Sequence, residues 1–131
     1  MNYLALILLA CSLSWTTAHA QEVTPSTTAY VNLLPPLVGN YGAGAKLKYY
    51  KADIALRIQA ENRGIVEHHA PLIRDQLIQL FTQQTDENMN SSEGKEALRK
   101  AALLQVQNAL QQEEGLILID DLLFNNFIVQ P

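Results

Sequence analysis

The longest regular pattern in the chain is an alternation of apolar and polar residues across residues 49–60. One parity is apolar, namely Tyr50, Ala52, Ile54, Leu56, Ile58 and Ala60. The other parity holds Lys51, Asp53, Arg57 and Gln59. Successive side chains of a β-strand point to opposite faces of the sheet, so the alternation predicts a strand with one buried and one solvent-facing side.

A second strand is predicted over residues 30–38, where Val31, Leu33 and Leu37 are apolar. Pro35 and Pro36 remove two backbone donors there, which a central strand would not tolerate. We therefore expect an edge strand that ends in a kink, followed by a glycine-rich loop over residues 39–44.

Helical spacing replaces the alternation over residues 65–81. One broad face carries Val66, His69, Ile73, Leu77, Leu80 and Phe81, which is typical of an amphipathic helix. Pro71 must either kink this helix or lie in the first turn of a second one. Residues 82–90 are predicted to be a polar connection.

The next helix is expected to begin at Ser91 or Ser92, either of which can cap it, and to run to about residue 113. Gly115 is a natural stop. The inward positions are predicted to be Leu98, Ala102, Val106, Ala109 and Leu110.

Residues 116–124 and 127–130 are apolar and short, and they predict one bent strand or two, joined at Asn125 and Asn126. The resulting order is strand, strand, helix, helix, strand. It predicts an α+β fold, with a small, mainly antiparallel sheet and two to three helices on one face.

The first twenty residues are predicted to be an export signal. Residues 4–10 form a short apolar core, and Ala18, His19 and Ala20 form a small-x-small cleavage site. We expect cleavage after Ala20, a flexible linker over residues 21–29 and a folded, exported domain over residues 30–131.

A lipoprotein signal is the alternative for the same segment. Leu8, Leu9 and Ala10 precede Cys11 in the order in which such signals place an acylated cysteine. Cys11 is the only cysteine of the chain, so the folded domain is expected to have no internal disulfide.

Composition narrows the class of partner. A chain of 131 residues with 48% hydrophobic residues suits one compact domain. Its formal net charge of −4 argues against nucleic acid, which requires a basic surface to neutralise phosphates.

Two pairs of neighbouring residues are candidates for chemistry. His68 and His69 would point about 100° apart on a helix, so they are not expected to chelate one metal ion. Asp120 and Asp121 would leave opposite faces of a strand, so we expect a surface or turn role rather than an acid/base pair.

Lys46, Lys48 and Lys51 form a small basic cluster. We expect them to be solvated, with contact to an acidic partner as the alternative. No nucleophile elbow or phosphate loop is present in the sequence. The residues therefore predict a binding or structural module without cofactor, metal or small-molecule substrate, and not an enzyme.

Four stretches in order resemble the FliL family of flagellar basal-body-associated proteins. Leu34-Pro35-Pro36-Leu37-Val38 with Asn40 is similar to that family's L-P-P-F-V-x-N opening. Residues 49–58 (YYKADIALRI) resemble its Y-L-x-x-x-I-A-L strand, and residues 70–75 (APLIRD) its M-P-x-I-R-D helix. Residues 92–99 (SEGKEALR) and 123–130 (LFNNFIVQ) are similar to its P-E-G-K-E-A-L-R and L-F-T-D-F-V-V-Q segments.

The resemblance implies a non-catalytic accessory protein of the flagellar basal body that supports the stator, swimming and swarming. It also implies a stomatin-like (SPFH-like) periplasmic domain at the inner membrane, partners among stator or basal-body proteins, and a homo-oligomeric ring. Members of the family usually begin with a transmembrane helix, whereas this chain begins with a short signal-like segment. A binding or scaffold module of a non-flagellar envelope assembly is therefore the alternative.

Overall fold

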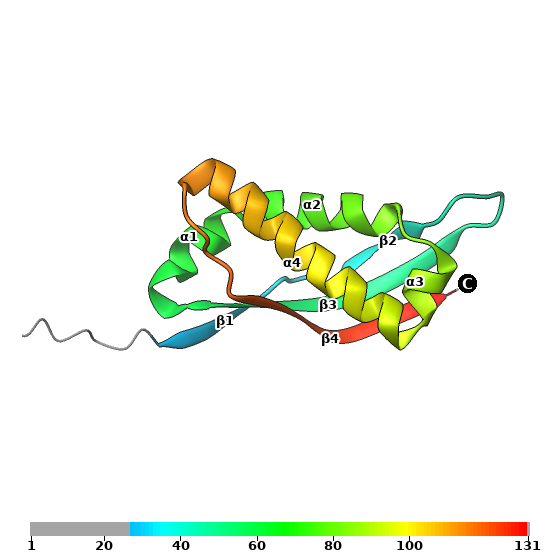
Figure 1. Cartoon of the computed structure of the whole chain (residues 1–131), viewed down its shortest axis with the longest axis horizontal. Helices are drawn as coiled ribbons and strands as arrows, with labels where there is room; N and C mark the ends of the chain where they lie inside the picture. The colour runs from blue at the N-terminus through cyan, green and yellow to red at the C-terminus, as the bar shows by residue number, and fades with distance from the viewer. Residues whose placement is uncertain (1–26, 131) are drawn as a thin grey trace, which may run out of the picture.

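The computed structural model describes residues 27–130 as a four-stranded sheet with helices packed against it (Figure 1). Along the chain the elements are β1 (Thr28–Asn32), β2 (Leu37–Tyr41), β3 (Lys48–Gln59), the 3₁₀ turn η1 (Ala60–Asn62), α1 (Arg63–His68), α2 (Ala70–Thr82), α3 (Asp86–Asn90), α4 (Ser92–Glu114) and β4 (Asp121–Gln130). The predicted α+β class with an antiparallel sheet is confirmed. The likeness to a stomatin-type fold stays a prediction.

Strand β3 is the centre of the sheet, and every other strand pairs with it antiparallel. β4 runs along one edge, from the Tyr49–Gln130 pair to the Arg57–Asp121 pair. The other edge is shared by two short strands, with β1 on the second half of β3 and β2 on the first half. The sheet therefore has one continuous and one divided flank.

The division of that flank comes from Pro35 and Pro36, which lie between β1 and β2. The prediction of one edge strand ending in a kink is corrected here, because the strand resumes at Leu37 and continues to Tyr41. The expected loop therefore begins three residues later than predicted. The bend itself is held by Arg74, whose Nη1 donates to the Pro35 carbonyl oxygen at 2.6 Å.

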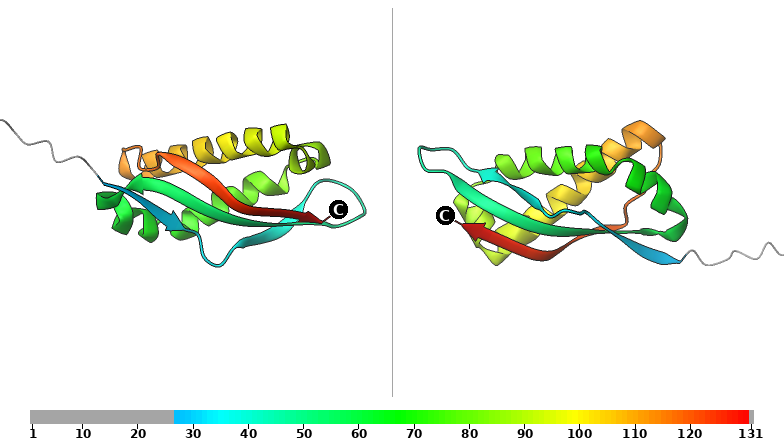
Figure 2. Two further views of the ribbon diagram at one scale, coloured as in Figure 1. Left: turned by 90° about the horizontal axis from the view of Figure 1, so that it is seen from below. Right: turned by 180° about the vertical axis from the view of Figure 1, so that it is seen from behind.

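All helices pack on one face of the sheet, where α2 and α4 form the main layer (Figure 2). The alternation in β3 is confirmed from Tyr50 to Ile58, since the apolar parity is buried under these helices. Ala60, predicted to share that face, is exposed because the strand ends at Gln59 and the chain turns into η1. The predicted inward residues of the helices are also buried, namely Val66, Ile73, Leu77, Phe81, Leu98, Ala102, Val106 and Leu110, whereas His69, Leu80 and Ala109 are only partly covered.

Pro71 occupies the first turn of α2, so the second of its two predicted positions is correct. The helix before it ends at His68, and the two helices are separate. Ser91 rather than Ser92 caps α4, because its Oγ accepts a hydrogen bond from the Gly94 amide at 2.9 Å. Gly115 ends α4 in the left-handed conformation, with φ of 73°, as expected for a glycine stop.

The prediction of a polar connection over residues 82–90 is wrong in part. Residues 86–90 form α3, whose first turn is capped by Thr85 through a bond from the Asn88 amide to Oγ1 at 3.3 Å. Met89 is its single buried residue and reaches the core. One apolar residue in five gives too weak a periodicity to predict a helix.

Strand β4 is one bent strand, which decides between the two predicted alternatives. It begins at Asp121, so residues 116–120 are not a strand, although Leu118 and Ile119 are buried. The register shifts opposite Asp53 and Ile54, where Asn125 is the extra residue of a β-bulge. The two asparagines therefore mark a bulge within one strand.

Two glycines allow close packing of neighbouring elements. Gly39 lies across from Tyr50 in the sheet, and a Cβ at Gly39 would lie 2.7 Å from the Tyr50 hydroxyl oxygen. A Cβ at Gly94 would lie 2.6 Å from the backbone of Asn88 in α3. Both contacts are shorter than side chains tolerate, so these positions depend on glycine.

No helix within residues 27–130 is both long enough and apolar enough to cross a membrane.

Candidate functional site

The two residues predicted to be processed, Cys11 and Ala20, lie outside the residues that the structure describes. Lipidation at Cys11 and signal cleavage after Ala20 therefore stay predictions. The linker predicted over residues 21–29 lies outside the described residues up to residue 26 and is wrong at its end, because Thr28 and Ala29 belong to β1.

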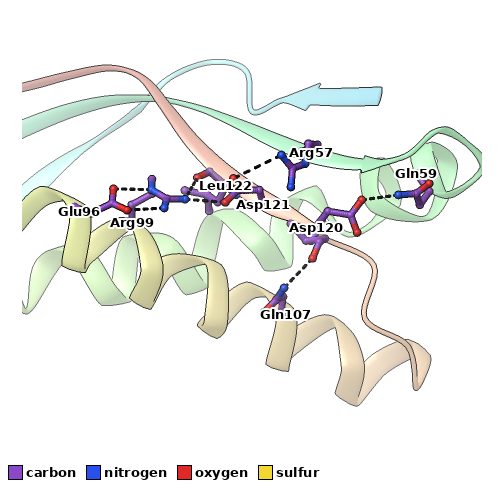
Figure 3. A network of polar contacts seen from close by, with 9 residues as sticks. Arg57, Gln59, Glu96, Arg99, Gln107, Asp120, Asp121 and Leu122 are labelled. Atoms are coloured by element: carbon purple, nitrogen blue, oxygen red, sulfur yellow. Dashed lines mark hydrogen bonds and ion pairs between the residues drawn. The ribbon is translucent and has the colours of Figure 1, made fainter. Parts of the chain in front are cut away.

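The neighbouring carboxylates of Asp120 and Asp121 bind different partners (Figure 3). Asp120 Oδ2 accepts a hydrogen bond from Gln59 Nε2 at 2.7 Å. Asp121 Oδ1 accepts one from Arg99 Nη1 at 2.7 Å. The two carboxylates therefore do not form an acid/base pair, in agreement with the prediction. The expected surface role holds for Asp120, which is exposed, but Asp121 is partly buried as the first residue of β4.

Arg99 is the centre of the network drawn in Figure 3. Besides Asp121, its Nη1 donates to the Leu122 carbonyl oxygen at 3.0 Å, and its Nη2 donates to Glu96 Oε1 at 2.6 Å. Arg57 approaches Asp121 from the sheet, with 4.0 Å between Nη1 and Oδ2. One guanidinium of α4 therefore fastens the start of β4 to the helix layer.

Arg99 and Glu96 each favour the charged form of the other. The hydrogen bond to Glu96, together with the nearby carboxylate of Asp121, raises the pKa of Arg99. The same hydrogen bond from Arg99 lowers the pKa of Glu96. Because every group in it already has an internal partner, we assign the network a structural role.

The histidine pair was predicted to lie on one helix, but His68 is the last residue of α1 and His69 lies between α1 and α2. The two ring centroids are 5.1 Å apart with 73° between the planes, and His68 is exposed. His69 lies at the edge of the apolar face and its Nε2 is 2.7 Å from Glu114 Oε1, at the end of α4. The sequence did not indicate that contact, because 45 residues separate the two positions.

The three lysines of the predicted basic cluster have different surroundings in the structure. Lys48, expected to be solvated, forms an ion pair with Asp86, the first residue of α3. That hydrogen bond lowers the pKa of Asp86. Lys46 is exposed in the loop before β3, and Lys51 is exposed on the sheet. The three amines therefore do not form one basic patch.

A hollow of about 420 Å³ lies between α2 and α4. Polar contacts cross it, because Gln105 Nε2 donates to the backbone oxygen of Gln76 at 3.0 Å and lies 3.1 Å from its Oε1. This glutamine pair joins α4 to α2 beside the hollow.

The helices leave the opposite side of the sheet uncovered. We call this side the open face, and define it as the strand residues that alternate in the register with those facing the helices: Thr28, Tyr30, Asn32, Val38, Asn40, Tyr49, Lys51, Asp53, Ala55, Arg57, Gln59, Asp121, Leu123, Asn126, Ile128 and Gln130. It mixes aromatic, aliphatic, amide and charged groups. At its edge, the Asp121 carboxylate turns back to Arg99 of α4.

One hollow of the open face, which we call the end hollow, has a volume of about 340 Å³. Its lining is largely aliphatic and aromatic and includes Val38, Tyr49 and Ile128, with Lys51 at its side. Val38 is 64% exposed and Ile128 is 45% exposed. Burial of these side chains by another protein would be favourable.

A second hollow, the central hollow, lies where the divided flank of the sheet opens. It has a volume of about 210 Å³ and is lined by Asn32, Leu33, Leu34, Asp53, Ile54 and Asn125. It is bounded on one side by the break between β1 and β2 and on the other by the bulge of β4. Two irregularities of the backbone therefore meet at one level of β3.

Asp53 is the only ionisable residue lining the central hollow. Its Oδ1 is covered from solvent and accepts no hydrogen bond from residues 27–130. The alternation placed Asp53 on the solvent-facing side of the strand, which is correct. Its missing partner could not be predicted, because it depends on a break and a bulge contributed by two other strands.

Within residues 27–130, no three side chains among His, Cys, Asp and Glu come together in a group that could hold a metal ion.

Comparison with known proteins identifies one family. The model of one protein family, described as flagellar basal body-associated protein FliL, matches residues 30–130. The match covers most of the chain and nearly all of the domain described above. No curated protein matches the chain.

Proposed function

Since the chain belongs to the FliL family, we propose that it is a non-catalytic accessory protein of the flagellar basal body that supports the stator, and with it swimming or swarming. The single observation that carries this proposal is the family match from residue 30 to residue 130. It spans every element of the fold from the second half of β1 to the end of β4.

The arrangement of the site supports action through binding. The charged groups that could have suggested chemistry are largely bound to one another, as in the contacts of Arg99 with Asp121 and of His69 with Glu114. The open face instead offers exposed apolar side chains and two hollows. A protein of this kind acts by being present, folded and in contact with its partners.

We place the domain in the periplasm, associated with the inner membrane and the basal body. Export by the predicted signal, with cleavage after Ala20 or lipidation at Cys11, would deliver it there. We propose stator or basal-body proteins as its partners and a homo-oligomeric ring as its assembly. Intact mass of the periplasmic form distinguishes a start at Gln21 from a lipid-modified start at Cys11.

Deletion of the gene tests the proposed role. Cells without the protein should spread less on soft agar or swarm agar while still assembling filaments, which electron microscopy counts. The full chain supplied in trans should restore spreading. Normal motility of the deletion strain on both media would overturn the flagellar role in favour of an accessory module of another envelope assembly.

Matched substitutions test action by binding rather than by chemistry. His68→Ala and Asp120→Ala change exposed residues and should restore motility as well as the unchanged chain does. A folded His68→Ala or Asp120→Ala protein that mimics the deletion would show that one polar group is essential, against the proposal.

A further inference from the structure

We propose that the central hollow binds an arginine side chain of a partner polypeptide, with Asp53 as its counter-charge. The inference rests on the proposed function, because it names the chemistry by which the open face would recognise that partner. It starts from the one carboxylate on the open face that has a covered oxygen without a hydrogen bond from residues 27–130.

The first argument is the cost of leaving a carboxylate oxygen unpaired. An oxygen removed from water without a donor raises the free energy of the folded chain. The other open-face carboxylate is satisfied, because Asp121 accepts from Arg99 and from its neighbour's amide. Asp53 therefore has the most to gain from a charged donor arriving from outside.

The second argument is the position of that carboxylate in the sheet. Strands β1 and β2 stop on either side of its level, and the β4 bulge displaces Asn125 on the other flank. A continuous sheet would have placed neighbouring side chains over Asp53. Here it lines a hollow instead. Rotation about the Cβ–Cγ bond of an aspartate costs little energy, so a small rotation can turn either carboxylate oxygen toward an incoming group.

The third argument is the rest of the lining, which suits arginine in particular. Asn32 and Asn125 supply amide oxygens beside the carboxylate, and these accept from a guanidinium that carries five donors in one plane. Leu34, which is 75% exposed, supplies apolar surface for its aliphatic stem. A volume of about 210 Å³ is close to that of one long side chain.

The experiment is a titration of the chain, as purified from its cells, with N-acetyl-arginine amide, followed by nuclear magnetic resonance of the side-chain amide groups of Asn32 and Asn125. The control probe is N-acetyl-citrulline amide, which has the same shape without the charge. We expect saturable shifts of both signals with the arginine probe and none with the citrulline probe. Equal responses to the two probes would overturn the proposal.

Variants identify the group responsible. Asp53→Asn should weaken the response about tenfold or more, as expected for loss of a charge-assisted pair. Glu113→Gln removes one exposed charge at the far end of α4 and should leave the response unchanged. An unchanged response in a folded Asp53→Asn protein would contradict the assignment.

A second variant covers the case in which Asp53→Asn does not fold. Leu34 is 75% exposed at the rim of the hollow, so Leu34→Lys should fold and place a competing cation there. It should also weaken the arginine response. Calcium chloride that shifts the two asparagine signals where the arginine probe does not would make the hollow a metal site and overturn the proposal.

Motility separates this inference from the proposed function. If deletion lowers motility and Asp53→Asn restores it fully, the hollow is not the partner site and the inference fails while the function stands. If deletion leaves motility normal, the function fails, and the titration alone decides whether the hollow binds arginine.

Discussion

On the helix-covered face of β3, Tyr50, Ala52, Ile54, Leu56 and Ile58 are at most 2% exposed and form the middle of the core. On the open face, the residues between them are mostly polar, and Asp53 has an oxygen without a partner among residues 27–130. The same strand thus separates two tasks. One face holds the fold together by filling volume, and the other presents mostly polar groups to solvent.

This separation has a practical consequence for mutation. Substitutions on the covered face should act on stability first and on binding only through loss of folded protein. Substitutions on the open face should act on binding and leave the free energy of unfolding nearly unchanged. Four predictions test how completely the two faces are separated.

The largest effect is expected from Ile54→Ala. This side chain is 2% exposed in the core, so its truncation should lower the free energy of unfolding by about 2–4 kcal/mol. Leu56→Ala should behave alike. Arg57→Ala, on the open face with a long 4.0 Å contact to Asp121, should cost well under about 1 kcal/mol. Urea unfolding measures all three, and equal costs for Ile54 and Arg57 would show that the faces are wrongly assigned.

Gly39→Ala is expected to be next. Its Cβ would lie 2.7 Å from the hydroxyl oxygen of Tyr50, and that ring is held by an edge contact to Phe81 at 5.1 Å between centroids. Overpacking of this kind costs about 1–3 kcal/mol. Removal of the hydroxyl by Tyr50→Phe should recover part of the loss. Additive costs in the double variant, measured by thermal unfolding, would contradict the contact.

A smaller effect is expected where the two faces meet at Asp121. Arg99→Ala should lower the free energy of unfolding by about 1–2 kcal/mol, because three of its hydrogen-bond partners lose a charged donor. A double-mutant cycle with Asp121→Ala should give a larger coupling energy for Arg99 than for Arg57. A larger coupling energy for Arg57 than for Arg99 would mean that the start of β4 is held mainly by Arg57 of the sheet.

The smallest effect concerns alkaline pH. Burial raises the pKa of Tyr50, and the nearby charge of Arg74 only partly opposes that shift. The unfolded chain therefore loses this proton first as pH rises above about 10. Stability should be independent of this group at neutral pH and should decline above that value. Tyr50→Phe should show a shallower decline in urea unfolding at alkaline pH, and an identical decline in both proteins would contradict the assignment.

Much of the covered face could be predicted from the sequence, because buried residues recur at regular spacing along a strand or a helix. The alternation in β3 and the helical spacing of Ile73, Leu77 and Phe81 are direct records of which side faces the core. The short helix α3 has almost no such pattern, because Met89 is its one buried residue. Strand β2 was partly missed for the same reason, since glycine and proline surround a run of five residues.

The open face could be predicted only in outline. Its polar residues follow from the alternation, but the partners of those residues come from distant parts of the chain. Arg99 reaches Asp121 across 22 residues, and Gln59 reaches Asp120 across 61. The central hollow is harder still, since it arises from the coincidence of a proline break and a bulge on opposite flanks of β3.

That coincidence also bears on the mechanics of the sheet. At the level of Asp53 and Ile54, the ladder is interrupted on one flank and out of register on the other, although Leu33 still donates to the Ile54 carbonyl oxygen at 2.9 Å. Bending stiffness in a sheet comes from rows of cross-strand bonds, so this level forms a compliant line between two stiffer halves. We expect the backbone amides of β3 at this level to exchange with solvent faster than those of its two halves, because fewer cross-strand bonds hold this level.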